Sequence, residues 1–345
     1  MLANPATIKD VASRAGISVA TVSHVLNGTR KVRVETRDRV FAAIEELGYS
    51  GHSIARSLRR GRTATLGLVV SDIENPFFAV LASHVQRAAL KKGYQVIFGN
   101  SEESGERERE ILDALGAQRV DGIILAPVAQ ENVEAMARRR IPLTLVNRRF
   151  EGVDAPHVIV DDHAGASLGF EHLWALGHRD IAIVHGGMQH STTLARVAGV
   201  RDAYRQRGIV FDEARLSIDA GRSGDAGEAG LVALMASGQR PSAILALGNW
   251  PMVAAIRGLH RGLIRCPDDV SLVGYGVTSP YWMPASSISM VEQPVIQMAD
   301  ASVQLLFDQL EKVVPAESVM LQPLFSAGES SAPLKRPLRR ASGKP

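Results

Sequence analysis

Residues 8–27, IKDVASRAGISVATVSHVLN, have the spacing of two short helices that cross steeply around a tight turn. Such a crossing needs a small side chain at the closest approach, a residue that permits the turn, and an apolar side chain between the helices. Ala12, Gly16 and Val22 meet these needs in that order. The pattern predicts a helix-turn-helix, and the alternative is an ordinary helical hairpin with small residues at its crossing.

Capping residues mark the start of both expected helices. Thr7 and Asp10 form a capping-box pattern before the first helix, and Ser18 is placed to cap the second. The first turn of the second helix then faces outward. The side chains expected to face DNA bases are Val19, Ala20 and His24.

Charge is distributed unevenly along the chain, although the net charge is only +3. Residues 1–63 hold eleven Lys and Arg against five Asp and Glu, and residues 333–345 add five cations and no acid, so residues 64–332 carry a net charge of −8. A basic N-terminal module suits a polyanion such as double-stranded DNA. The Pro-rich basic tail is predicted to be disordered and solvated, and a second contact site is the alternative.

Length and composition indicate a folded protein of two or three domains. The chain has 345 residues, 46% of them hydrophobic, and a single cysteine, Cys266, which excludes a disulfide framework. No apolar run approaches the roughly 18 residues of a membrane helix. The start, MLANPATIKD, lacks the features of a signal peptide. We therefore expect a cytoplasmic protein without contact to a membrane.

A third helix and a short basic segment follow the helix-turn-helix. Residues 35–47, ETRDRVFAAIEEL, place apolar residues at helical spacing before Gly48, which is typical of a helix end. Those apolar residues are Val40, Phe41, Ile44 and Leu47. Residues 54–58 can form a helix that is too short to be stable alone, so its order must come from a partner.

From residue 65 onward, short apolar runs alternate with helix-length segments. The expected strands are residues 65–71, 94–100, 120–127, 142–148, 157–162, 180–186, 242–248 and 271–276. Continuous Val, Ile and Leu runs are buried on both faces, which indicates parallel sheets with right-handed crossovers. These strands are too many for one compact sheet. We predict an α/β core of two doubly wound subdomains, with a ligand between them at the carboxyl ends of the strands.

The chain resembles the LacI/GalR family of bacterial repressors from Thr7 to about Gly328. The motifs that carry the resemblance occur in the family's order: TIKDVASRAGISVATVSHVLNGT, IARSLRRGRT, GLVVSDIENPFF, VDGIILAP, EHLWALGHRDIAIV and PDDVSLVGYG. The resemblance implies an all-α helix-turn-helix headpiece, a hinge helix, a periplasmic-binding-protein-like core and a homodimer controlled by a small-molecule effector. No leucine-rich heptad extension follows the core, so a dimer is expected rather than a tetramer.

The same resemblance divides the chain into expected domains. The headpiece is residues 1–49, the hinge helix and linker residues 50–63, the core residues 64–332 and the tail residues 333–345. Within the core, one subdomain combines residues of about 64–162 and 292–325, and the other spans about 163–291.

The resemblance also implies roles for individual residues toward DNA. Val19, Ala20 and His24 would face base edges in the major groove, while Ser18, Thr21 and Asn27, with Thr7 before them, would hold phosphates or the flank. In the hinge, Leu58 matches the family's minor-groove wedge, beside Ala55 and Arg59. The alternative is that Leu58 only packs the hinge on the core. Gly51 and His52 replace the family's usual Pro-Asn pair, which predicts a looser hinge without DNA.

In the core, the resemblance implies an effector cleft. Its expected residues are Phe77, Phe78, Asn147, Arg148, Arg196, Arg222, Asn249, Trp250 and Gly276. Gly276 and Trp250 stand where sugar-binding relatives carry aspartates, while several arginines remain. Because Arg pairs with carboxylate and phosphate, we predict an anionic effector such as a sugar acid or a sugar phosphate. The alternative is that Arg148 and Arg222 point to water.

Two other classes of function are alternatives to a DNA-binding regulator: an enzyme and a solute-binding protein. The sequence does not support an enzyme, because the chain lacks a phosphate loop, an HExxH helix and a GxSxG elbow, and its ten His residues show no metal spacing. We interpret His185, His190, Asp161 and Asp162 as cleft or surface residues of a binding fold, and expect no cofactor. A solute-binding protein would share the core, but the basic headpiece and the absence of a signal peptide argue against it.

Overall fold

The computed structural model describes residues 6–27, 30, 32–47, 62–221, 224–277, 288–312 and 316–334. Several residues singled out above lie outside these ranges: Gly48, Gly51, His52, residues 54–58, Ala55, Leu58, Arg59, Arg222 and the tail from residue 335. Among the helices of the described ranges, none combines the length and apolar character that crossing a lipid bilayer requires.

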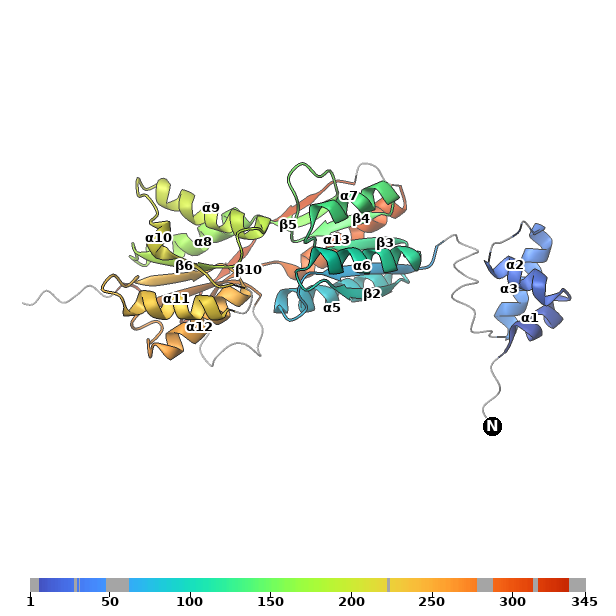
Figure 1. The fold of residues 1–345 in the computed structure, drawn as a ribbon, viewed down its shortest axis with the longest axis horizontal. Coiled ribbons are helices and arrows are strands. Elements are labelled where there is room, and N and C mark those ends of the chain that lie inside the picture. Colours follow the sequence, from blue (N-terminus) through green and yellow to red (C-terminus); the bar gives the residue numbers. More distant parts are fainter. Residues whose placement is uncertain are drawn as a thin grey trace, which may run out of the picture.

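The headpiece consists of three helices around its own small core (Figure 1). They are α1 (Ile8–Ala15), α2 (Val19–Asn27) and α3 (Val34–Leu47). The predicted capping box is confirmed, because the Asp10 amide donates to Thr7 Oγ1 and the Thr7 amide donates to Asp10 Oδ2. Gly16 ends α1 with φ 66°, a left-handed conformation that favours glycine. Ala12 and Val22 are buried between the helices, as a steep crossing requires.

The first subdomain contains a six-stranded parallel sheet in the order β11-β5-β4-β3-β1-β2. Its strands are β1 (Thr65–Val70), β2 (Gln95–Asn100), β3 (Gly122–Leu125), β4 (Leu143–Val146), β5 (His157–Val160) and β11 (Val319–Leu321). Helices α5 (Pro76–Lys91) and α13 (Val295–Leu310) share one apolar cluster with the sheet. Helices α6 (Gly105–Ala117) and α7 (Gln130–Arg139) contribute to a second cluster. The sheet is therefore buried on both faces, as its apolar runs predict.

The second subdomain repeats this plan in the order β12-β10-β9-β8-β6-β7, with β12 antiparallel. Its strands are β6 (Ile181–His185), β7 (Ser217–Asp219), β8 (Ala243–Ala246), β9 (Ser271–Gly276), β10 (Ser289–Glu292) and β12 (Leu324–Ser326). Its helices are α8 (Asp162–Ala175), α9 (Ser191–Arg205), α10 (Glu213–Leu216), α11 (Asp225–Ala236) and α12 (Asn249–Arg261). The apolar residues of α8 and α9 form one cluster with the sheet, and those of α11 and α12 form another.

The chain passes between the two sheets three times: after β5, between β10 and α13, and between β11 and β12. All eight expected strands are present, and β7, β10, β11 and β12 are additional. The expected division placed residues up to about 325 in the first subdomain. In the structure β12 belongs to the second sheet, because Val291 of β10 pairs with Phe325.

Candidate DNA-binding surface and effector cleft

Helix α2 presents its first turn to the outside of the headpiece. Val22, Val25 and Leu26 are buried on the opposite face, so Val19, at 40% exposure, and Ala20 remain accessible. His24 lies one turn further along and is half-buried. The predicted cap is confirmed, since the Thr21 amide donates to Ser18 Oγ over 3.1 Å. This face has the shape that base contact in a major groove requires.

The residues expected to contact phosphates differ in how available their polar groups are. Ser18 and Thr21 lie at the start of α2, with their hydroxyl oxygens 2.8 Å apart, so one of the two hydroxyl protons stays available for a phosphate. Thr7 donates both its amide and its hydroxyl to Asp10 Oδ2, each over 2.7 Å, which lowers the pKa of Asp10. The side chain of Asn27 lies outside the described residues.

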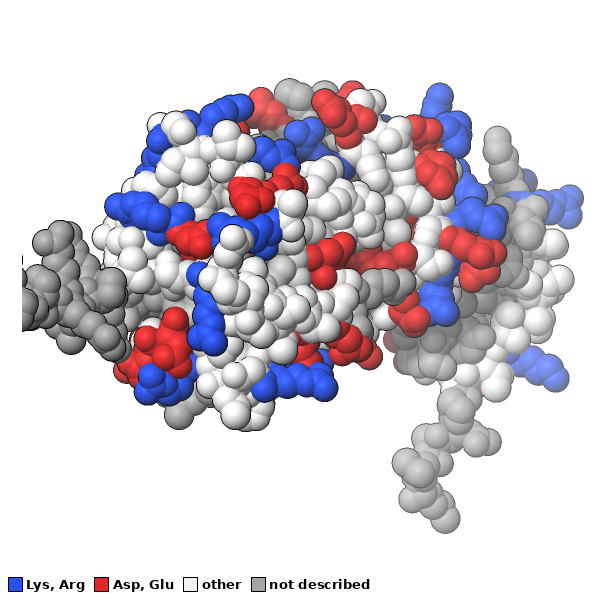
Figure 2. Space-filling model, turned by 60° about the vertical axis from the view of Figure 1, so that its left-hand side comes forward, with Lys and Arg blue, Asp and Glu red and all other residues white. Residues whose placement is uncertain are grey.

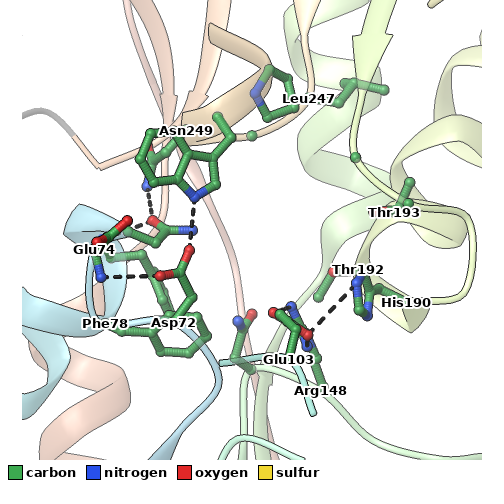
Figure 3. Close-up of a pocket in the computed structure, with 18 of the residues that line it drawn as sticks. Asp72, Glu74, Phe78, Glu103, Arg148, His190, Thr192, Thr193, Leu247 and Asn249 are labelled. Carbon is green, nitrogen blue, oxygen red and sulfur yellow. Dashed lines mark hydrogen bonds and ion pairs between the residues drawn. The ribbon is translucent and has the colours of Figure 1, made fainter. Parts of the chain in front are cut away.

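Between the two subdomains lies a cleft of about 740 Å³ (Figure 3). It is lined by residues that follow the carboxyl ends of strands in both sheets, the place predicted for a ligand. All of the expected effector residues except Gly276 and the undescribed Arg222 line it. Residues that the sequence analysis did not single out also do so, among them Asp72, Glu74, Glu102, Glu103, Gln189, Thr192, Thr193, Asp219 and Gln293.

Arg196 does reach the cleft from α9, but its charge is already neutralised. Its Nε donates to Asp162 Oδ1 over 2.7 Å, and its Nη1 donates to the Leu247 carbonyl oxygen over 3.0 Å. The Tyr275 hydroxyl donates to the same Asp162 oxygen over 2.7 Å, and the guanidinium lies 4.0 Å from the Tyr275 ring centroid. Arg196 therefore does not support the prediction of an anionic effector, because its buried charge already has the compensating partner that it requires.

Arg148 is paired as well, at the other side of the cleft. Its two terminal nitrogens donate to the two carboxylate oxygens of Glu103 over 2.8 and 2.7 Å, a bidentate pair. His190 of the second subdomain lies 3.8 Å from the same carboxylate (Figure 3). Burial alone would raise the pKa of Glu103, but Arg148 and His190 outweigh it and lower the pKa to about 2. The alternative that Arg148 points to water is also wrong, since its side chain is only 12% exposed.

Hydrogen bonds between the subdomains close one side of the cleft. Trp250 Nε1 donates to Asp72 Oδ2 over 2.8 Å, and Asn249 Nδ2 donates to Asn75 Oδ1 over 2.7 Å (Figure 3). Trp250 replaces an expected aspartate, yet it holds the carboxylate of Asp72 beside it. The loss of carboxylates inferred from the sequence is thus offset by acids that come from the first subdomain.

Gly276 has a steric role. Its φ is 144°, and a Cβ at this position would lie 2.2 Å from Asn249 Oδ1. Asn249 Oδ1 in turn accepts from the Val277 amide over 3.2 Å. With Asn249 in this position, an aspartate at 276 would require the Asn249 side chain to move.

The aromatic candidates form the floor of the cleft from α5. Phe77 and Phe78 are almost fully buried, with ring centroids 5.0 Å apart and edge-to-face geometry. Both are members of the first subdomain's apolar cluster, so each contributes to packing as well as to the lining. Asn147 follows β4 with φ 69°, which carries the chain away from the strand end beside the cleft.

The residues considered for acid-base chemistry have structural partners instead. His185 contacts the Gly186 carbonyl oxygen through Nδ1 and Ser217 Oγ through Nε2. Asp161 accepts from the Ala164 amide and caps α8, next to the paired Asp162. Within the described ranges, no three His, Cys, Asp or Glu side chains gather as a metal site requires.

Comparison with known proteins supports both halves of this description. Residues 7–51 match the family model of bacterial regulatory proteins of the lacI family. Residues 63–317 match the model of periplasmic binding proteins and the sugar binding domain of the LacI family. The HTH-type transcriptional repressor PurR of Erwinia tasmaniensis is 34% identical over 88% of this chain and 90% of that protein.

Solved structures of similar proteins have the same fold. The transcriptional regulator CelR in complex with cellobiose matches with a TM-score of 0.71 and 27% identity, over 94% of this chain and 100% of that chain. The lac repressor dimer bound to operator and an anti-inducer matches with a TM-score of 0.77, over 95% of this chain and 100% of that chain. At 23% identity the second likeness concerns the fold alone. The chain therefore belongs to the lacI family of bacterial regulatory proteins and is a DNA-binding transcriptional regulator, not an enzyme or a transport-associated solute-binding protein.

Proposed function

We propose that this protein is a cytoplasmic repressor that binds a near-palindromic operator as a dimer and responds to a neutral, hydroxyl-rich small molecule in the cleft. The observation that carries the DNA-binding part is the outward first turn of α2, which presents Val19 and Ala20 with His24 behind them. Apolar side chains can contact a thymine methyl group, and His24 can donate to a guanine acceptor.

Dimer formation agrees with the exposed edge of the first sheet. Strand β2 is an edge strand in the described structure, and its Phe98 is 42% exposed. An edge strand with an exposed aromatic side chain offers both backbone groups and apolar area to a second copy. A two-fold dimer then matches two operator half-sites.

The charge of the cleft favours a neutral effector over the anion expected from the sequence. Five carboxylate side chains line the cleft, while the two arginines that the structure describes there are each paired with an acid. A carboxylate accepts hydrogen bonds from hydroxyl groups but repels an anion. CelR, whose structure contains the neutral disaccharide cellobiose, is a relative with such a ligand.

Gln293 supplies a donor for the same ligand. Its side chain is buried at the cleft, and its Nε2 has no hydrogen-bond partner among the described residues. A buried amide donor without a partner is costly, so a ligand oxygen placed beside Nε2 is held by a hydrogen bond that relieves this cost.

A mobility-shift assay tests the DNA-binding part of the proposal. It compares the wild-type protein with the His24→Ala variant on DNA from upstream of the protein's own gene. We expect the wild type to form a retarded complex, and we expect the variant to change the preference at one base pair of each half-site by roughly 1–3 kcal/mol. Absence of a complex would contradict the operator proposal. An identical base-preference profile for the variant would show that His24 does not contact bases.

Ligand-dependent melting tests the effector class, because a ligand stabilises the folded state by mass action. Glucose and glucuronate serve as one matched pair in a wider set of neutral and acidic sugars. We expect stabilisation by a neutral member and none by its acidic counterpart. Tighter binding of an acidic sugar than of every neutral one would overturn this part of the proposal and leave the DNA-binding part unaffected.

A further inference from the structure

The end of the first subdomain opposite the cleft is rich in cations. Because its sheet is parallel, all strands begin at one edge, and the helices that precede them end at that same edge. Basic side chains occupy these helix ends: Lys91, Arg119, Arg138, Arg139, Arg140 and Lys312. We call this surface the hinge-side basic end. Figure 2 shows basic side chains, with acidic ones among them, at the right-hand end of the molecule.

Part of this charge is compensated and part is not. Arg139 forms an ion pair with Asp113 over 2.6 Å, and Arg138 lies 3.9 Å from Glu134. The four other exposed cations of this surface have no ion-pair partner within 4 Å in the part of the chain that the structure describes: Lys91, Arg119, Arg140 and Lys312.

Three of these four residues have an unfavourable backbone conformation. Arg119, Arg140 and Lys312 have φ values of 55°, 56° and 60°, which lie in the left-handed region where glycine is preferred at helix ends. A cation at a helix end gains attraction to the helix dipole, but that gain is no larger than the cost of a left-handed conformation. Dipole compensation alone therefore does not account for three cations at positions that suit glycine, and strained positions of this kind point to a function.

The chain arriving from the headpiece enters the core at this surface. Thr63 Oγ1 donates to the carbonyl oxygen of Arg119 over 3.0 Å, and the Arg62 guanidinium donates to the carbonyl oxygen of Leu310 at the end of α13. Fourteen residues separate Leu47, the end of α3, from Arg62. Even a fully extended segment of that length spans no more than about 50 Å. The headpiece is thus tethered within about 50 Å of the hinge-side basic end, and a linker that is not fully extended brings DNA held by the headpiece closer to this surface.

We propose that the hinge-side basic end is a second DNA contact, in which Arg119, Arg140 and Lys312 bind backbone phosphates of the duplex held by the headpiece. The inference rests on the proposed DNA-binding function. Contacts of this kind carry no base preference and raise affinity through release of counterions. They add a salt-dependent contribution that a headpiece alone would lack.

Salt-dependent binding to a random-sequence duplex of about 40 base pairs tests the proposal, measured by fluorescence anisotropy of the full-length protein from about 50 to 200 mM KCl. The variant carries Arg119→Gln, Arg140→Gln and Lys312→Gln. We expect the slope of log affinity against log salt to become less steep by about 0.9 for each phosphate that the variant no longer binds. A second variant carries glycine at the same three positions, which suits the left-handed backbone. The same change of slope in this variant excludes misfolding as the cause of the weaker salt dependence.

A matched control removes three cations from the second subdomain, through Arg205→Gln, Arg240→Gln and Arg257→Gln. Its net charge equals that of the first variant, so it reports the effect of overall charge alone. The proposal is overturned by a wild-type slope in the first variant, or by an equal change in the control. If the wild type itself does not bind DNA, the proposed function fails first, and the two failures are thereby distinguished.

Discussion

Replacing Asp162 with Asn leaves the Arg196 guanidinium buried without a negative partner. The two side chains are 6% and 9% exposed, and a 2.7 Å hydrogen bond joins them. Asn keeps the shape and an acceptor oxygen for Tyr275, so the substitution removes charge with little change in packing. The loss of one partner from a buried ion pair costs about 3–5 kcal/mol of unfolding free energy. For a core of this size that lowers the melting temperature by roughly 6 °C or more.

Urea and thermal unfolding followed by circular dichroism measure this cost. The control is Glu213→Gln in the same subdomain, which removes an acid from an exposed pair with Arg201 over 2.8 Å. An exposed pair contributes about 0–1 kcal/mol, so the control variant should unfold close to the wild type. A cost below about 1 kcal/mol for Asp162→Asn would refute the conclusion that the pair is desolvated.

The same variant tests the interpretation of the cleft charge. Without Asp162, Arg196 becomes the unpaired cation that an anion can neutralise. We expect inorganic phosphate to raise the melting temperature of Asp162→Asn and to leave that of the wild type unchanged. Equal stabilisation of both proteins would show that wild-type arginines already attract anions.

Three further predictions concern other parts of the molecule. Phe98→Arg places a charge on the exposed edge of the first sheet and should convert the dimer to a monomer, as light scattering would show; a dimer that persists excludes this edge from the interface. The pKa of Glu103 is lowered from 4.5 to about 2, so the stability that Glu103 gives should be complete above pH 4.5 and lost as the pH falls toward 2. The stability difference between wild type and Glu103→Gln should shrink over that range, and a constant difference would contradict the pairing with Arg148. Gly16→Ala meets no atom within 4 Å but must adopt φ 66°, so headpiece unfolding should become easier by about 1 kcal/mol, measured by calorimetry; unchanged stability would contradict the left-handed turn.

The sequence predicts the fold well because its strongest signals are local. Seven of the eight expected strands are largely buried, and all eight contain an apolar run that stands out without knowledge of its neighbours. The four additional strands are three or four residues long, and β11 and β12 are separated by only two residues. Runs this short depend on pairing with strands that are distant in the chain, so no local pattern marks them.

The electrostatics of the cleft could not be predicted in the same way. Arg148 and Glu103 are 45 residues apart, and Arg196 and Asp162 are 34 residues apart. A count of arginines along the sequence therefore overestimates the positive charge that a ligand meets. Gly276 illustrates the reverse case: its departure from the family pattern is visible in the sequence, but the close approach of Asn249 to this position is not.

The chain passes between the two sheets three times, and this topology sets the order in which parts of the protein can fold during synthesis. The effector-binding core can be completed only late. Strand β11 completes the first sheet, and β12 is paired with β10 at the edge of the second, so both subdomains wait for residues beyond 318. Ser330 contributes one more contact to the second subdomain, because its hydroxyl donates to the carbonyl oxygen of Leu272 in β9 over 2.6 Å. The headpiece has its own apolar cluster and is free to fold as soon as it leaves the ribosome. A nascent or truncated chain can thus possess a folded DNA-binding module while it still lacks the core that senses an effector.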